Sequence, residues 1–196
     1  LHELDSHGAI GVGFGGGEPT LHPEFAELCA EAAQQTNLAV TFTTHGHRLT
    51  DSLLANLKGN VHFIRISMDG VAATYERLRG QPFVSLIERL TAIADVAPFG
   101  INCVVNTDTI SELETVALVG ETSGATELLL LPERPVGTHG GISAMNLRKL
   151  RDWVLGYRGP LRLAISDDHA ADLPICDPFQ NESGLRGYAH IDATGV

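Results

Sequence analysis

Short apolar runs alternate with longer amphipathic segments along most of the chain, and this alternation is the feature that most constrains its fold. Apolar runs that predict strands occupy 8–14, 38–44, 61–69, 101–106, 126–132 and 161–166. Segments that predict helices occupy 23–36, 49–59, 83–97, 109–124 and 143–157. Nearly continuous apolar strands separated by helices indicate a parallel sheet covered by helices, which makes the fold class α/β. Both a doubly wound open sheet and a whole or partial barrel satisfy this pattern, and both place ligands at the carboxyl ends of the strands.

Local signals indicate where some of these helices begin and end. Pro23 suits the first turn of the helix over 23–36, and Gly59 suits the end of the helix over 49–59. Ser111 or Thr109 is a candidate N-cap for the helix over 109–124.

Composition limits the classes of function. The 196 residues suffice for one domain with a proper core, or for one domain and part of another. The net charge is −11, from 24 acidic against 13 basic residues, which argues against a general nucleic-acid binder. No apolar run approaches the ~20 residues that span a bilayer, and we expect no membrane association. The three cysteines are odd in number and widely spaced, so we expect a reducing cytoplasm rather than a disulfide framework.

The character of the sequence changes after residue 166. The stretch that follows is polar, rich in Gly and Pro, and has little periodicity, whereas 188–196 alternates like the first strand of a hairpin. We therefore predict a barrel-type domain over 1–166, and a linker with the start of a second module over 167–196.

Each predicted strand is followed by a polar, glycine-bearing or proline-bearing segment, and these segments should converge on one edge of the sheet. Any one of them alone also suits an ordinary turn. The glycines from Gly11 to Gly16 match G-x-G-x-x-G, but Glu18 and Pro19 intervene before the next helix, which argues against a dinucleotide site. Glycines at a strand end expose backbone polar groups, and the Glu18 carboxylate can accept a hydrogen bond from a cationic amine. This arrangement suits a ligand with an amino-acid headgroup.

Several single residues have a structural interpretation beside a functional one. Cys29 lies on an apolar helical stripe and Cys103 lies mid-strand, so we expect both in the core. His45 and His47 lack a third ligand for zinc and are expected in a loop at the substrate mouth. Strand alternation buries Met68 and places Ser67 and Asp69 on one face. Those two residues and Arg79 suit a ligand carboxylate, with an ion pair from Arg79 to Asp69 or Glu76 as the structural alternative.

Five segments, in order, resemble the motifs of radical S-adenosylmethionine (radical SAM) enzymes. GFGGGEPTLHPEF (13–25) resembles the glycine-rich segment that meets the methionine amino group of the cofactor. The later segments are TFTTHGHRL (41–49), FIRISMDG (63–70) with YERLRG (75–80), INCVVN (101–106) and LLLLPERPVG (128–137). His45 stands where the family usually has Asn. The resemblance covers residues 1–166 and implies a partial (β/α)6 TIM-like barrel.

The resemblance implies a set of cofactor-binding residues. For S-adenosyl-L-methionine these are Gly16, Gly17, Glu18, Pro19, Thr44, Ser67, Asp69, Arg79, Asn106 and Leu131. The C-x-x-x-C-x-x-C signature of the family, which binds the [4Fe–4S] cluster, is absent. The resemblance therefore implies that the first strand and the cysteine loop are missing from this chain.

The tail carries a second resemblance. Cys176 followed by YAHIDATGV (188–196) resembles the entry to a SPASM or Twitch extension, whose cysteines hold auxiliary iron–sulfur clusters. This implies Cys176 as a cluster ligand, with a plain loop thiol as the alternative.

The implied activity is radical chemistry. In the family a reduced [4Fe–4S] cluster cleaves S-adenosylmethionine to a 5′-deoxyadenosyl radical that abstracts hydrogen from a substrate. Members with such tails often modify peptides, so a peptide substrate is expected, with a small molecule or cofactor precursor as the alternative. An electron donor, such as a reductase, flavodoxin or ferredoxin, is also implied. The rival hypothesis is a cluster-free barrel that binds S-adenosylmethionine or a nucleotide, and cysteines upstream of Leu1 would separate the two.

Overall fold

Six parallel strands form one sheet whose order follows the sequence. The structure, a computed structural model, describes residues 1–137, 140–165 and 191. The strands are β1 (Gly11–Phe14), β2 (Ala39–Thr44), β3 (Phe63–Ser67), β4 (Phe99–Val105), β5 (Glu127–Pro132) and β6 (Arg162–Ile165). They are hydrogen-bonded in the order β1-β2-β3-β4-β5-β6, and every neighbouring pair is parallel. A doubly wound sheet requires a reversal of strand order, so this order decides for the partial barrel.

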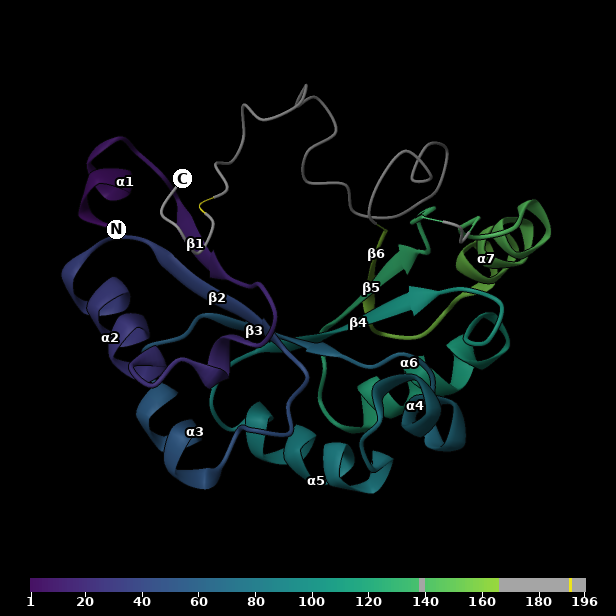
Figure 1. Cartoon of the computed structure of the whole chain (residues 1–196), viewed down its shortest axis with the longest axis horizontal. Coiled ribbons are helices and arrows are strands. Elements are labelled where there is room, and N and C mark those ends of the chain that lie inside the picture. The colour runs from purple at the N-terminus through teal and green to yellow at the C-terminus, as the bar shows by residue number, and fades with distance from the viewer. Residues whose placement is uncertain (138–139, 166–190, 192–196) are drawn as a thin grey trace.

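The helices cover one side of the curved sheet (Figure 1). They are α1 (His2–Ser6), α2 (Phe25–Gln35), α3 (Asp51–Leu57), α4 (Ala72–Arg79), α5 (Phe83–Ala94), α6 (Leu113–Thr122) and α7 (Ala144–Gly156), with 3-10 turns η1 (Pro19–Leu21) and η2 (Ile110–Glu112). In Figure 1 α2 to α6 lie along the convex side, α7 lies near β6, and α1 lies beyond β1. We call the opposite side of the sheet the concave face.

The core lies between the sheet and the convex-side helices. Alternate strand residues supply it, because successive side chains point to opposite faces of a sheet. Buried strand residues of this set are Val40, Phe42, Ile64, Ile66, Ile101, Cys103, Leu128 and Leu130. Cys29 and Met68 are also fully buried, as the sequence predicted.

The predicted elements that fall on described residues are confirmed within a few residues, and two helices, α1 and α4, were not predicted. The sequence pattern placed no helix at α4, whose N-cap residue, Val71, has no side chain able to cap. The cap comes instead from Glu112, which accepts hydrogen bonds from the Val71 amide at 2.8 Å and the Thr74 hydroxyl at 2.6 Å. A cap supplied from about forty residues away leaves no local sequence signal.

Two other local predictions were wrong in detail. Helix α2 begins at Phe25, so Pro23 precedes the helix rather than opening it. The helix predicted over 109–124 is η2 followed by α6, and neither Ser111 nor Thr109 supplies a side-chain cap to them. Thr109 occupies the N-cap position of η2, but its hydroxyl donates to the Val104 carbonyl at 2.6 Å and ties the loop to the end of β4.

Most of the predicted second module, 167–196, lies outside the described residues, which include only position 191 of it. Cys176 therefore lies outside them. Within the described part of the chain, no helix combines the length and apolar character that crossing a membrane requires.

Candidate functional site

The segment after β1 presents bare backbone to open space. A Cβ atom placed on Gly15, Gly16 or Gly17 would meet no neighbouring atom within 4 Å. Gly16 has φ of +95°, a conformation that favours glycine. These three residues therefore leave room for a ligand to approach main-chain N–H and C=O groups directly.

Glu18 fixes this glycine segment to β2. Its Oε1 accepts hydrogen bonds from the Thr20 amide (3.2 Å), the Thr20 hydroxyl (2.5 Å) and the Thr44 hydroxyl (2.7 Å). Its Oε2 accepts from the His45 amide at 2.9 Å and lies 3.3 Å from His45 Nε2. Pro19 begins the short helix η1. The carboxylate that the sequence assigned to a ligand amine thus has protein donors, and it anchors the loop that carries the glycines.

Hydrogen bonds keep Glu18 ionised. Burial by itself raises the pKa of Glu18, but the hydrogen bonds from Thr20, the His45 amide and Thr44 outweigh it, and the net pKa lies below 4.5. Glu18 is therefore a carboxylate at neutral pH.

Behind Glu18, the two histidines at the end of β2 have separate partners. The ring centroids of His45 and His47 lie 5.5 Å apart. His47 Nε2 lies 2.8 Å from the Tyr75 hydroxyl. Burial raises the pKa of Tyr75 to about 12, and burial together with the nearby His45 charge lowers the pKa of His47. A hydrogen bond between a neutral His47 and a protonated Tyr75 therefore fixes the loop between β2 and α3.

Asp69 and Arg79 form an ion pair at the end of β3. Asp69 Oδ2 lies 2.6 Å from Arg79 Nη2, and its Oδ1 accepts from the Val104 amide at 2.7 Å. Burial raises the pKa of Asp69 above 3.8, although the Val104 amide and the Arg79 guanidinium stabilise its charged form. The Nε of Arg79 is buried and has no acceptor within the described ranges. Of the two ion pairs considered from the sequence, the one with Asp69 is present, and Arg79 retains an unused donor.

The other predicted positions lie at the neighbouring strand ends. Ser67 is the last residue of β3 and is half-buried. The Asn106 side-chain oxygen accepts from the amides of Asp108 and Thr109, so it holds its own loop, and its nitrogen lies 3.4 Å from Glu133 Oε1. Leu131, in β5, is half-buried and lies in register with Val104. The structure thus brings the described candidate residues to one edge of the sheet.

Sequence reasoning missed three partners in this site. Thr20 donates twice to Glu18, the Val104 amide orients Asp69, and Tyr75 holds His47. A Thr two residues after an acid is a local turn signal that could have indicated Thr20. The other two contacts join residues from different strands or helices and leave no signal in the sequence.

Comparison with known proteins decides the family. Residues 1–117 match the radical SAM superfamily. The chain belongs to the radical SAM superfamily. The mycofactocin maturase MftC of Mycolicibacterium smegmatis is 29% identical over 166 residues, which cover 79% of this chain and 42% of the maturase. This radical SAM chain therefore spans less than half the length of that relative.

Two further proteins bear on the fold and on the range of relatives. Streptococcus suis SuiB superposes on the chain with a TM-score of 0.71 and 16% identity, covering 85% of this chain and 41% of SuiB. This likeness confirms the partial barrel. An S-adenosylmethionine-dependent nucleotide dehydratase of a Thermoplasmatales archaeon is 26% identical over 94 residues, covering 48% of this chain and 34% of the dehydratase.

The described residues of this radical SAM chain do not fit an iron–sulfur cluster. Within them no group of three or more His, Cys, Asp or Glu side chains could hold a metal ion. Cys29 and Cys103 are buried on different elements, and burial raises the pKa of each thiol to about 12. Both thiols stay protonated, whereas cluster ligands are thiolates.

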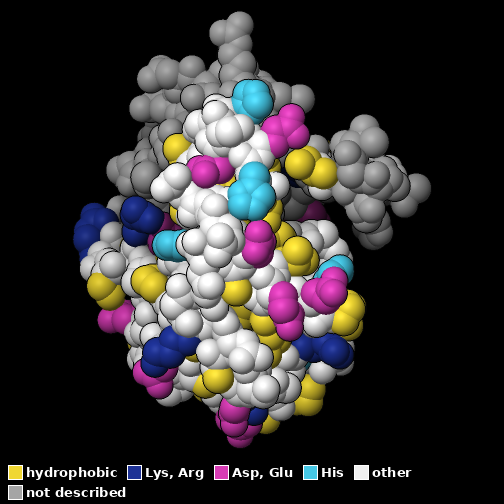
Figure 2. Space-filling model, turned by 90° about the vertical axis from the view of Figure 1, so that its left-hand side faces the viewer, with side chains coloured by type: hydrophobic (Ala, Val, Ile, Leu, Met, Phe, Trp, Pro, Cys, Tyr) yellow, Lys and Arg dark blue, Asp and Glu magenta, His cyan; other side chains and the backbone are white. Residues whose placement is uncertain are grey.

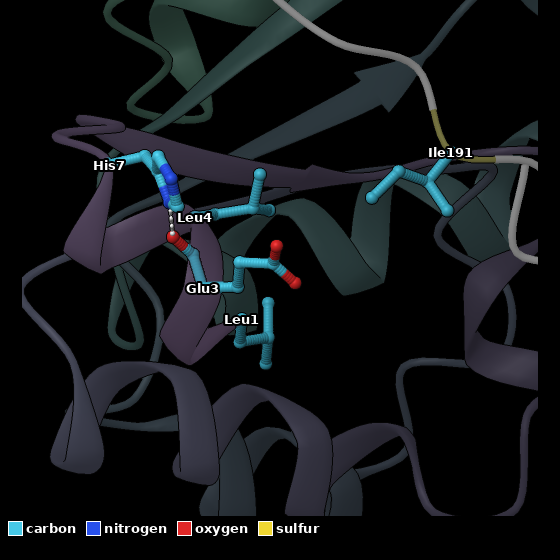
Figure 3. A pocket seen from close by; sticks show the side chains of 5 residues that line it. All are labelled: Leu1, Glu3, Leu4, His7 and Ile191. Carbon is cyan, nitrogen blue, oxygen red and sulfur yellow. Dashed lines mark hydrogen bonds between the residues drawn. The ribbon is translucent and has the colours of Figure 1, made fainter.

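A small pocket lies away from this edge. It has a volume of about 320 Å³ and is lined by Leu1, Glu3, Leu4, His7 and Ile191 (Figure 3). Four of the lining residues belong to α1 and its two capping positions, which precede β1, and no candidate site residue contributes. On this side of the molecule acidic and histidine side chains are interspersed with hydrophobic ones (Figure 2). The pocket therefore plays no part in the candidate site.

Proposed function

We propose that this chain is the cofactor-binding barrel of an enzyme that cleaves S-adenosylmethionine reductively and removes hydrogen from a bound substrate. The observation that carries the proposal is the open backbone of Gly15, Gly16 and Gly17, held in place by the buried carboxylate of Glu18. Membership of the radical SAM superfamily supports it.

In this proposal the methionine end of the cofactor lies against the glycine segment. Bare backbone carbonyl groups accept hydrogen bonds from its ammonium group without interference from a side chain. The exposed part of the Arg79 guanidinium, whose side chain is 31% exposed, and the hydroxyl of Ser67 are donors for its carboxylate. Thr44 and Pro19 keep the Glu18 loop in position, and Asn106 and Leu131 border the nucleoside. Asp69 orients Arg79 through their ion pair.

The cluster requires cysteines that this chain does not provide. We propose that three cysteines in a segment preceding Leu1 in the complete gene product bind a [4Fe–4S] cluster. When bound, the cluster supplies the electron that cleaves the cofactor. We also propose that 1–166 is the barrel, that 167–196 leads into a SPASM- or Twitch-like extension, and that Cys176 is one ligand of an auxiliary cluster. A cytoplasmic location and a reductase, flavodoxin or ferredoxin as electron donor accord with this chemistry.

A peptide is the substrate class we propose. MftC is named as a maturase, and one structure of SuiB contains its precursor peptide SuiA. The likeness to a nucleotide dehydratase covers a shorter part of the chain and makes a small molecule the alternative.

A glycine variant tests the proposed cofactor site. The Gly17→Ala side chain would enter open space, so folding should be unaffected, but the added methyl group would meet the cofactor. We expect S-adenosylmethionine to bind at least about tenfold more weakly by calorimetry on the reconstituted whole protein. Gly156→Ala, at the end of α7 and also in open space, is the control and should bind normally. Equal affinity in both variants, with unchanged thermal midpoints, would show that the glycine segment does not contact the cofactor.

A further inference from the structure

A row of charged side chains crosses the concave face away from the candidate cofactor site. The backbone register aligns Arg65 of β3 with Gly100, Gly100 with Glu127, and Glu127 with Arg162 of β6. All four positions alternate with buried, convex-facing residues, so they face the concave side. We call these four residues the arginine row.

Gly100 makes this row possible. A Cβ atom there would lie 3.0 Å from the Glu127 Cβ and 3.1 Å from the Phe63 ring. Because Gly100 has no side chain, Arg65 reaches across β4 to Glu127, with Nη2 2.8 Å from Oε2. The Arg65 guanidinium also lies 5.1 Å from the centroid of the Phe63 ring. Arg162 contacts the other carboxylate oxygen, Oε1.

The row carries more positive charge than its own carboxylate balances. Two guanidinium groups share the buried Glu127, whose side chain is 7% exposed. Burial, and after it the charge of Arg162, lower the pKa of Arg65, as expected for two guanidinium groups that repel each other. The side chains of Arg65 and Arg162 remain 30% and 63% exposed, so a ligand can reach them.

Arg65 and Arg162 have N–H groups to spare for a ligand. A guanidinium has five N–H groups. Among the described residues, Arg65 makes two such contacts, one to Glu127 and a longer one of 3.4 Å to the Asn102 oxygen, and Arg162 makes one, to Glu127. Arginine binds carboxylates through paired N–H groups in a planar fork.

We propose that the arginine row is a substrate subsite that binds a carboxylate of the peptide substrate. This inference rests on the proposed function and adds the chemistry of the group recognised. The carboxylate is either the C-terminus of the peptide or an acidic side chain.

The strand geometry sets the distance between this subsite and the reacting position. An extended chain advances about 3.3 Å per residue, so Asp69, four residues after Arg65 and just beyond the end of β3, lies about 13 Å from it. An extended peptide covers that distance in about four residues. The subsite therefore predicts that the modified residue lies about four positions from the bound carboxylate.

A peptide library tests the subsite through binding alone. Random pentapeptides are prepared with a free carboxylate and as C-terminal amides, each with acidic and neutral members. They are incubated with the whole reconstituted protein, and the bound peptides are identified by mass spectrometry. We expect carboxylate-bearing members to be enriched about tenfold over matched amides, the scale of one charge-assisted pair. Enrichment confined to free C-termini, or to Asp and Glu, identifies the source of the carboxylate.

Variants connect the enrichment to the row. Arg162→Gln removes the more exposed arginine and should abolish most of the enrichment. The double variant Arg65→Gln with Glu127→Gln removes one charge of each sign, so it leaves no lone buried carboxylate, and it should also reduce enrichment. Arg151→Gln, exposed on α7, is the matched control and should behave like the parent protein.

Each outcome decides the proposal. The subsite proposal is overturned if the parent protein shows no enrichment, or if Arg162→Gln enriches carboxylate-bearing peptides as strongly as the parent protein does. In either case the arginine row would only connect neighbouring strands. S-adenosylmethionine binding is measured on the same samples. If the parent protein does not bind S-adenosylmethionine, the proposed function is contradicted. If the variants still bind S-adenosylmethionine but no longer enrich carboxylate-bearing peptides, the subsite is supported independently of the cofactor site.

Discussion

At the scale of the residue, Glu18 has the most consequences for the candidate site. Its carboxylate connects the glycine segment, η1 and the end of β2 through Thr20, Thr44 and His45. The side chain is 7% exposed, so each of these hydrogen bonds is made largely out of water. Glu18 therefore acts by positioning the backbone that a ligand would contact.

Replacing Glu18 should destabilise the protein in a pH-dependent way. Glu18→Gln places an NH₂ donor where the neighbouring groups are themselves donors. We therefore expect a loss of about 1–3 kcal/mol in the free energy of unfolding at pH 7. The folded state lowers the pKa of Glu18 below 4.5. The stability that the ionised Glu18 contributes is therefore fully present above pH 4.5 and is lost as the pH falls through the lowered pKa. The difference between parent and variant, measured by urea unfolding, should therefore shrink below pH 4.5.

Glu24→Gln, at an exposed position nearby, serves as the control and should leave the pH dependence unchanged. A constant difference between Glu18→Gln and the parent protein from pH 7 to pH 3 would contradict the role given to the Glu18 carboxylate.

At the scale of the element, the sequence predicted strands and most helices because each carries its own periodicity. Two features that the sequence did not predict depend on distant partners. Helix α4 is capped by Glu112, and the arginine row exists only because Gly100 faces Glu127 across the register. Likewise, the sequence motifs placed Glu18 at the site. They did not predict that Thr44 and His45 at the end of β2 bind its carboxylate, because these contacts depend on the pairing of β1 with β2.

The non-local cap of α4 gives a prediction for this element. Glu112→Ala leaves the Val71 amide and the Thr74 hydroxyl without their acceptor, so we expect a loss of about 1–2 kcal/mol in stability. Since α4 ends at Arg79, S-adenosylmethionine binding should weaken as well. Chemical denaturation and calorimetry measure both effects. Glu121→Ala, exposed on α6, is the matched control; if it costs as much as Glu112→Ala, the cap has no special role.

At the scale of the whole molecule, the distribution of charge matters more than its sum. The chain carries −11 overall, and a net charge of this sign taken alone fits a basic or neutral substrate. The concave face nevertheless bears the arginine row, where two guanidinium groups share one carboxylate. Charges beyond about 8–10 Å are screened at physiological salt, so the local excess decides which groups bind there.

The fold places two chemically different regions on one curved sheet. The carboxyl edge holds the glycine segment, Glu18 and the Asp69–Arg79 pair, and the arginine row lies further down the concave face. Helices cover the convex side of the sheet, so both regions lie on the parts of it that these helices do not cover (Figure 1).

The most direct test of the central claim is formation of 5′-deoxyadenosine. The whole protein is reconstituted with iron and sulfide without oxygen, then given dithionite and S-adenosylmethionine, and the products are analysed by mass spectrometry. Radical chemistry predicts 5′-deoxyadenosine that depends on the cluster and is strongly reduced in Gly17→Ala but retained in Gly156→Ala. Binding of S-adenosylmethionine without any 5′-deoxyadenosine, in protein that carries no cluster after reconstitution, would contradict the account and favour a cofactor-binding barrel without radical chemistry.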